Sequence, residues 1–115
     1  MKILVLGANG LIGSTIFRVL SKVSDHNVHG TIRHKSNSSI FSKDIQKNII
    51  TNIDILDEFA LADLFMEYRP NVIINCTGIT KHSSNADNPL IVLPINSLFP
   101  HKLVKLSKLI GARVI

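Results

Sequence analysis

Short apolar runs alternate along this chain with segments in which apolar residues recur every three or four positions. Residues 3–6 form an unbroken apolar run, which is typical of a parallel strand buried on both faces. Alternating strands and helices favour a parallel sheet with helices on both of its faces. The first predicted helix has helical spacing in its apolar residues Ile12, Ile16, Val19, Leu20 and Val23. Further strands are expected at residues 28–33, 48–53, 72–74 and 112–115.

A second helix is predicted to begin after Asp57, whose carboxylate suits the N-cap position. Pro70 ends this helix, because proline lacks the N–H that a continuing helix needs. Tyr68 is the only tyrosine of the chain and is expected to pack in the core. The apolar side of the helix is predicted to consist of Phe59, Leu61, Leu64, Phe65 and Tyr68.

A third helix is predicted over residues 91–110, with Gly111 as its stop. Pro94 falls in its first turn, where proline is tolerated, whereas Pro100 lies inside and should kink the helix. The residues after Gly111 resemble the opening of a fifth strand, which would leave an unpaired sheet edge. We therefore expect residues 1–115 to be part of a longer polypeptide.

Composition indicates one compact domain. The chain has 115 residues, of which 45% are hydrophobic, and its mean hydropathy is +0.27. This excludes a disordered tail and supports a buried core. No apolar run approaches the roughly 20 residues that a membrane span needs, and the N-terminus lacks the pattern of a secretory signal. With Cys76 as its single cysteine, the chain suits a reducing compartment, and a cytoplasmic location is expected.

The net charge of +5 invites comparison with nucleic-acid-binding proteins. The basic residues, however, are spread along the chain, and aromatic residues make up only 5% of it. Lys102, Lys105 and Lys108 do cluster, but near the end of a predicted helix, where the helix dipole favours cations. We expect no nucleic-acid partner, and a bound anionic cofactor accounts better for part of this charge.

Three glycines separate the first predicted strand from the first predicted helix. Gly7 permits a tight turn, Gly10 lets the backbone approach a diphosphate, and Gly13 allows close packing of helix and strand. The helix N-terminus that follows attracts negative charge. An ordinary glycine turn is the alternative, but the strand before and the helix after favour a binding role.

The G-x-x-G-x-x-G spacing resembles that of the extended short-chain dehydrogenase/reductase superfamily, which includes sugar-nucleotide reductases, epimerases and dehydratases. Residues 54–57 look like the D-x-x-D of that superfamily, and residues 70–76 look like its fourth strand. Residues 95–115 are most similar to the dTDP-4-dehydrorhamnose reductase branch. The resemblance implies an α/β fold, namely the N-terminal half of a Rossmann-like doubly wound parallel sheet. The implied strand order is 3-2-1-4 with the start of strand 5, and the implied unit is the N-terminal part of an NAD(P)-binding domain whose remainder lies outside residues 1–115.

The same resemblance implies which residues hold a dinucleotide. Asp54 and Ile55 would lie by the adenine, although Asp54 also fits a plain strand-end carboxylate. Cys76, Thr77 and Gly78 would pass close to the ribose and diphosphate. Cys76 itself is better explained as a small buried residue than as a nucleophile. Asn96 would lie near the active site, or it could satisfy backbone groups at the Pro100 kink. The remaining candidates for cofactor binding are Gly7, Asn9, Gly10, Leu11, Ile12 and Gly13.

The choice between NAD and NADP depends on the end of the second predicted strand. Arg33 lies about 20 residues after Gly13, where an NAD-binding unit carries an acidic residue. An arginine can instead bind a 2′-phosphate with two hydrogen bonds. His34 and Lys35 add cationic groups. A solvated basic loop is the alternative, but we expect NADP rather than NAD.

No catalytic residue is predicted. The superfamily uses a tyrosine and a lysine four residues later, whereas Tyr68 is followed at that distance by Val72. The five histidines form no H-E-x-x-H motif and no Cys/His pair, so no metal site is expected either. The parent protein is expected to be an NADP-dependent reductase of a nucleotide-linked 4-keto sugar. An epimerase or dehydratase of the same superfamily, or a non-enzymatic NADP-binding sensor, remains the alternative.

Overall fold

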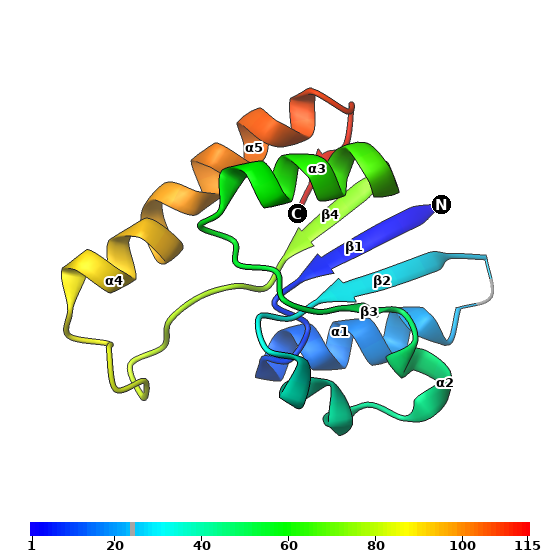
Figure 1. The fold of residues 1–115 in the computed structure, drawn as a ribbon, viewed down its shortest axis with the longest axis horizontal. Helices are drawn as coiled ribbons and strands as arrows, with labels where there is room; N and C mark the ends of the chain where they lie inside the picture. Colours follow the sequence, from blue (N-terminus) through cyan, green and yellow to red (C-terminus); the bar gives the residue numbers. More distant parts are fainter. Residues whose placement is uncertain (24) are drawn as a thin grey trace.

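The computed structural model describes residues 1–23 and 25–115 and contains one five-stranded sheet. The strand order is β3-β2-β1-β4-β5 and every pairing is parallel, so the predicted Rossmann-like topology is confirmed. The sheet forms the middle layer of the molecule in Figure 1. Its strands are β1 (Lys2–Leu6), β2 (Asn27–Thr31), β3 (Ile49–Ile50), β4 (Val72–Asn75) and β5 (Arg113–Val114).

Helices cover both faces of the sheet (Figure 1). On one face, α3 (Glu58–Tyr68) and α5 (Phe99–Lys108) pack over a core that includes Leu4, Leu6 and Ile73. The opposite face carries α1 (Leu11–Ser21), a 3₁₀ stretch at Lys35–Ile40 and the short α2 (Lys43–Gln46). The second core, which lies on this face, contains Ile3, Val5, Ala8, Phe17, Val28, Ile32 and Phe41.

The buried face of α1 differs from the predicted one. Ile12 and Val19 are exposed, and Gly13, Ser14 and Phe17 are buried instead. The reason is that Gly13 brings the first turn of α1 against the backbone of the glycine turn, which rotates Phe17 toward the sheet. A similar correction applies to Phe59 in the first turn of α3, which is 86% exposed although spacing placed it on the apolar side.

The third strand is shorter than predicted, because the backbone leaves the extended conformation at Asn52. Its φ of 62° lies in the left-handed region, which asparagine tolerates better than most residues. Ile53 nevertheless donates from its N–H to the Ile32 carbonyl, so the chain stays beside β2. This detour brings the following residues, Asp54 and Ile55, to the end of β2.

The last helical segment begins earlier than predicted and has three parts. They are α4 (Pro89–Leu93), a π-helical stretch (Pro94–Leu98) and α5, so Pro94 does not lie in the first turn. Pro100 has no N–H for the usual bond to the residue four before it, and the π-helical stretch ends at Leu98, two residues before it. The predicted interruption at Pro100 therefore takes the form of a π-helical stretch. Gly111, with a φ of 70°, follows the helix end as expected.

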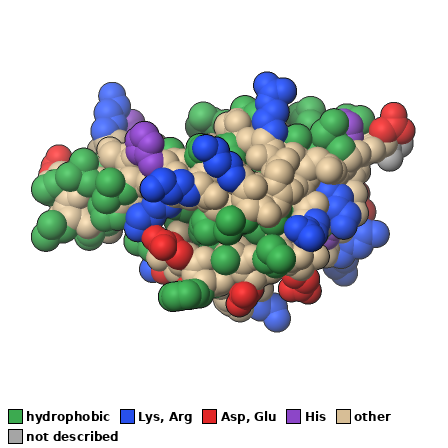
Figure 2. Space-filling model, turned by 90° about the horizontal axis from the view of Figure 1, so that it is seen from above, with side chains coloured by type: hydrophobic (Ala, Val, Ile, Leu, Met, Phe, Trp, Pro, Cys, Tyr) green, Lys and Arg blue, Asp and Glu red, His purple; other side chains and the backbone are tan. Residues whose placement is uncertain are grey.

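The surface carries separate apolar and charged regions. Figure 2 shows hydrophobic side chains gathered over the α4 end, where Leu90 and Leu93 are exposed. Lys102, predicted to act on the helix dipole, extends from α5 to Glu58 in the first turn of α3, with an Nζ–Oε1 distance of 2.6 Å.

Candidate functional site

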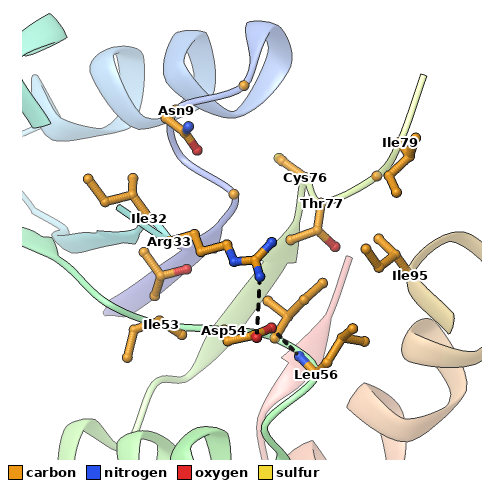
Figure 3. Close-up of a pocket in the computed structure, with 15 residues that line it drawn as sticks. Asn9, Ile32, Arg33, Ile53, Asp54, Leu56, Cys76, Thr77, Ile79 and Ile95 are labelled. Atoms are coloured by element: carbon orange, nitrogen blue, oxygen red, sulfur yellow. Dashed lines mark hydrogen bonds and ion pairs between the residues drawn. The ribbon is translucent and has the colours of Figure 1, made fainter. Parts of the chain in front are cut away.

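A pocket of about 320 Å³ opens at the carboxyl ends of β1, β2 and β4 (Figure 3). This is also where the strand order reverses, since β1 pairs with β2 on one side and with β4 on the other. Ligands of open parallel sheets bind at such a point. The wall of the pocket consists of Gly7, Asn9, Gly10, Thr31, Ile32, Arg33, Ile53, Asp54, Ile55, Leu56, Cys76, Thr77, Gly78, Ile79 and Ile95.

The glycine turn forms one side of this pocket. Gly7 has a φ of 73°, and a Cβ there would lie 3.0 Å from the Cys76 carbonyl oxygen. A Cβ at Gly13 would lie 2.2 Å from the Gly7 carbonyl oxygen, so only glycine fits without movement of the backbone. The predicted reasons for these two glycines thus agree with their surroundings.

The first turn of α1 follows directly on Gly10, which lines the pocket, and its N–H groups have no acceptor within the helix. Gly10 is the N-cap and provides no side chain to bond them, and the first turn of α1 has no acidic residue. A Cβ at Gly10 would meet only the Gly7 carbonyl oxygen, at 3.5 Å. The turn therefore leaves open space beside unpaired donors, which is the chemistry that binds an anion such as a diphosphate.

The segment after β4 forms the opposite side. Cys76 donates from its N–H to the Leu6 carbonyl, which extends the sheet by one bond. The Asn75 Oδ1 atom accepts from the Thr77 hydroxyl at 2.6 Å and from the Thr77 N–H at 3.2 Å. Burial raises the pKa of the Cys76 thiol, which favours its protonated form.

Asn96 fixes the same segment from the π-helical stretch. Its Oδ1 atom accepts from the Ile79 N–H and its Nδ2 atom donates to the Ile79 carbonyl, both at 2.8 Å. The backbone groups that it satisfies are thus those of the loop after β4 and not those at the Pro100 kink. A contact with a cofactor stays a prediction for this residue.

Arg33 and Asp54 meet at the third side, from the ends of β2 and β3. Figure 3 shows the Arg33 side chain reaching across the pocket toward Asp54, with an Nη2–Oδ2 distance of 3.8 Å. The two side chains are 68% and 45% exposed. The other carboxylate oxygen, Oδ1, accepts from the Leu56 N–H at 3.0 Å. Asp54 thus braces its own turn while facing the guanidinium.

Some predicted binding residues lie outside the pocket wall. Leu11 and Ile12 expose their side chains on the first turn of α1, and Gly13 packs against Gly7. His34 and Lys35 start the 3₁₀ stretch instead of facing the pocket. The wall contains these predicted residues: Gly7, Asn9, Gly10, Arg33, Asp54, Ile55, Cys76, Thr77 and Gly78.

Sequence reasoning missed the largely apolar part of the wall. In a single sequence an apolar residue that lines a pocket has the same pattern as one that fills the core, so only the neighbouring predicted residues offered a signal. The added residues are Thr31, Ile32, Ile53, Leu56, Ile79 and Ile95.

In the described part of the chain, no three His, Cys, Asp or Glu side chains come together as a metal site would require. In the same residues, no helix has the length and apolar character needed to cross a bilayer.

Comparison with known proteins relates this geometry to a family. The model of the NAD dependent epimerase/dehydratase family matches residues 3–115. The chain belongs to this family. It is 30% identical over 99 residues to a probable low-salt glycan biosynthesis reductase, Agl14, of Haloferax volcanii, with 86% of the chain and 30% of that protein covered.

Solved structures of other proteins share the fold. A dTDP-4-dehydrorhamnose reductase from Clostridium acetobutylicum is 26% identical, with a TM-score of 0.72 over 99% of this chain and 34% of that one. The UDP-glucose 4-epimerase of Thermus thermophilus, solved with NAD, is 21% identical, with a TM-score of 0.78 over 97% of this chain and 35% of that one. Residues 1–115 thus span about a third of the length of these proteins.

Proposed function

We propose that this chain is the NADP-binding portion of an oxidoreductase that reduces a nucleotide-linked 4-keto sugar. The observation that carries the proposal is Arg33 at the pocket mouth, in the position where a dinucleotide-binding unit specific for NAD has an acidic residue. Its guanidinium carries a permanent charge and can bind a phosphate with two hydrogen bonds.

The pocket fits the parts of a dinucleotide. The unpaired N–H groups behind Gly10 would bind the diphosphate, and the open space above Gly10 leaves room for it. Asp54 and Ile55 would lie by the adenine, with Ile32 and Ile53 as apolar wall, while Arg33 would bind the 2′-phosphate. Cys76, Thr77 and Gly78 would lie by the ribose and diphosphate on the other side.

The reductase part of the proposal rests on the relatives. The Haloferax protein, 30% identical, and the Clostridium enzyme, 26% identical, are both named as reductases. When bound, the dinucleotide supplies the hydride for such a reduction. Residues 1–115 contribute the binding and orientation of the dinucleotide. They lack the tyrosine and lysine pair of the superfamily, so we assign them no catalytic residue.

An epimerase or dehydratase is the second candidate. The family carries that description, and the Thermus epimerase shares the fold over nearly the whole chain. Incubating the full-length protein with NADPH and either a 4-keto or a 4-hydroxy nucleotide sugar separates the candidates. A reductase oxidises one NADPH for each 4-keto sugar consumed, whereas an epimerase interconverts sugars with no net oxidation.

Calorimetric titration of the full-length protein with NADP and NAD tests the cofactor proposal. Arg33→Ala is expected to weaken NADP binding about 10- to 100-fold, as loss of a charge-assisted hydrogen-bonded pair does, and to change NAD binding little. Lys105→Ala, which removes an exposed cation on α5, is the matched control and is expected to change neither. Equal losses for both dinucleotides would contradict the 2′-phosphate assignment, and no binding of either would overturn the proposed function.

A further inference from the structure

Arg33 and Asp54 have opposite effects on a 2′-phosphate: the guanidinium attracts it and the carboxylate repels it. A dinucleotide-binding unit usually resolves the choice with one residue at the end of its second strand, either an acid for NAD or an arginine for NADP. In this chain the arginine stands there, and a carboxylate reaches the same place from the end of β3. The turn at Asn52 brings it there.

We propose that Asp54 is a specificity-determining residue that competes with the 2′-phosphate of NADP for the Arg33 guanidinium. This inference rests on the proposed dinucleotide site and goes beyond it, because it assigns Asp54 a role in choosing between the two cofactors. A protein built in this way favours NADP only modestly and still accepts NAD.

The geometry of the pair supports competition. The closest N–O distance is 3.8 Å, whereas a charge-assisted hydrogen bond is about 2.7–2.9 Å long. Asp54 therefore attracts the guanidinium without locking it. A 2′-phosphate, with a charge between about −1.5 and −2 and three acceptor oxygens, is a stronger partner and can take the guanidinium over.

NAD and NADP differ in their effect on the Arg33–Asp54 ion pair. An adenosine with a free 2′-hydroxyl brings no charge to draw Arg33 away, so NAD leaves the ion pair in place. NADP must break the pair, and its phosphate then lies near the uncompensated Asp54 carboxylate. Both effects weaken the binding of NADP relative to that of NAD. Both disappear when Asp54→Asn replaces the carboxylate with an amide.

The substitution that tests the proposal is Asp54→Asn. An asparagine keeps an Oδ1 atom for the Leu56 N–H, so the turn after β3 retains its bond. Asp54→Ser also offers an acceptor to that turn, and it serves as a second variant should the asparagine destabilise the fold. Any contact of residue 54 with adenine is common to NAD and NADP and cancels in the ratio of their dissociation constants.

The measurement is the ratio of dissociation constants, Kd for NAD over Kd for NADP, by calorimetry on the full-length protein. Asp54→Asn is expected to raise this ratio about two- to fivefold, the range of an exposed ion pair. Asp63→Asn removes an equal charge from the exposed side of α3 and is expected to leave the ratio unchanged.

An Arg33→Gln background completes the test. With no guanidinium to compete for, Asp54→Asn is expected to change the ratio less there than in the native background. An equal change in both backgrounds would mean that the carboxylate only repels phosphate, and the competition proposal would be wrong. Equal changes in the affinities for NAD and NADP in Asp54→Asn would overturn the competition proposal as well.

Failure of the proposed function has a different signature. If the native protein binds neither dinucleotide, the cofactor site and the competition are both refuted. If NADP binds and weakens selectively on Arg33→Ala while Asp54→Asn leaves the ratio unchanged, the cofactor site stands and the role of Asp54 alone is refuted.

Discussion

The imidazole Nδ1 atom of His29 lies 2.8 Å from the hydroxyl oxygen of Tyr68, toward the end of the sheet opposite the pocket. The hydroxyl also lies 2.9 Å from the Asn27 carbonyl oxygen; when it donates its hydrogen there, the His29 tautomer with a proton on Nδ1 can donate to Tyr68. Lys2 lies over the Tyr68 ring, with Nζ 5.5 Å from the ring centroid. Burial of the hydroxyl raises the pKa of Tyr68 to about 12.

This arrangement predicts a stability that depends on pH. Burial, followed by the charge of Lys2, lowers the pKa of His29 below its ordinary 6.5. The unfolded chain therefore binds a proton at a higher pH than the folded one, and stability is complete above 6.5 and decreases as the pH falls below it. Urea unfolding at pH 7.5 and pH 5.5 measures this loss.

The matched comparison for that experiment uses two histidines. His29→Gln is expected to flatten the change in unfolding free energy between the two pH values. His82→Gln, in the exposed loop after β4, is expected to retain it. If both variants keep the native slope, His29 is not the group that titrates.

Two glycines of the turn are expected to affect different properties when replaced: Gly13 the stability of the fold and Gly10 the binding of the dinucleotide. Gly13→Ala places a methyl group 2.2 Å from the Gly7 carbonyl oxygen, and overpacking of this kind costs about 1–3 kcal/mol. Gly10→Ala places its methyl group at an ordinary 3.5 Å, in the space proposed for the diphosphate. Thermal unfolding should therefore show a lower Tm for the first variant only.

Dinucleotide titration completes the comparison of the two alanines. Gly10→Ala is expected to weaken NADP and NAD equally, because both carry the diphosphate, while its Tm stays near the native value. A Gly10→Ala protein that binds normally would place the diphosphate elsewhere.

The two hydrogen bonds of Asn96 join the π-helical stretch to the loop after β4, and we expect them to stabilise the fold. Asn96→Ala removes two hydrogen bonds, each worth about 0.5–1.5 kcal/mol, and should lower the free energy of unfolding by about 1–2 kcal/mol because the site is exposed. Ser97→Ala, next to it and also exposed, should change the unfolding free energy much less. Urea denaturation measures both, and similar losses would argue against the link.

The sequence was most informative where one residue has one structural use. The spacing of Gly7, Gly10 and Gly13 predicted the turn, and the apolar run of residues 3–6 predicted a central strand, because each pattern is local in the sequence and needs no distant partner to be read. The exposed face of α1 was less predictable, since Ile12 has the spacing of a core residue and only the close approach of Gly13 turns it outward.

Contacts between distant segments could not be predicted from local pattern. The sequence gives Asp54 a family motif, but its meeting with Arg33 depends on the left-handed turn at Asn52. The same holds for Asn96, whose partner Ile79 lies in another segment. A side chain that bonds a remote backbone group leaves no periodic signal.

The position of β1 between β2 and β4 has a consequence for synthesis. During translation β1 meets its first neighbour when Thr31 has emerged, but its second edge stays open until Asn75 has emerged. The glycine turn is likewise unsupported until Cys76 arrives beside Gly7. A nascent chain that stops short of β4 therefore exposes an apolar strand edge, and chaperones would engage it during that interval.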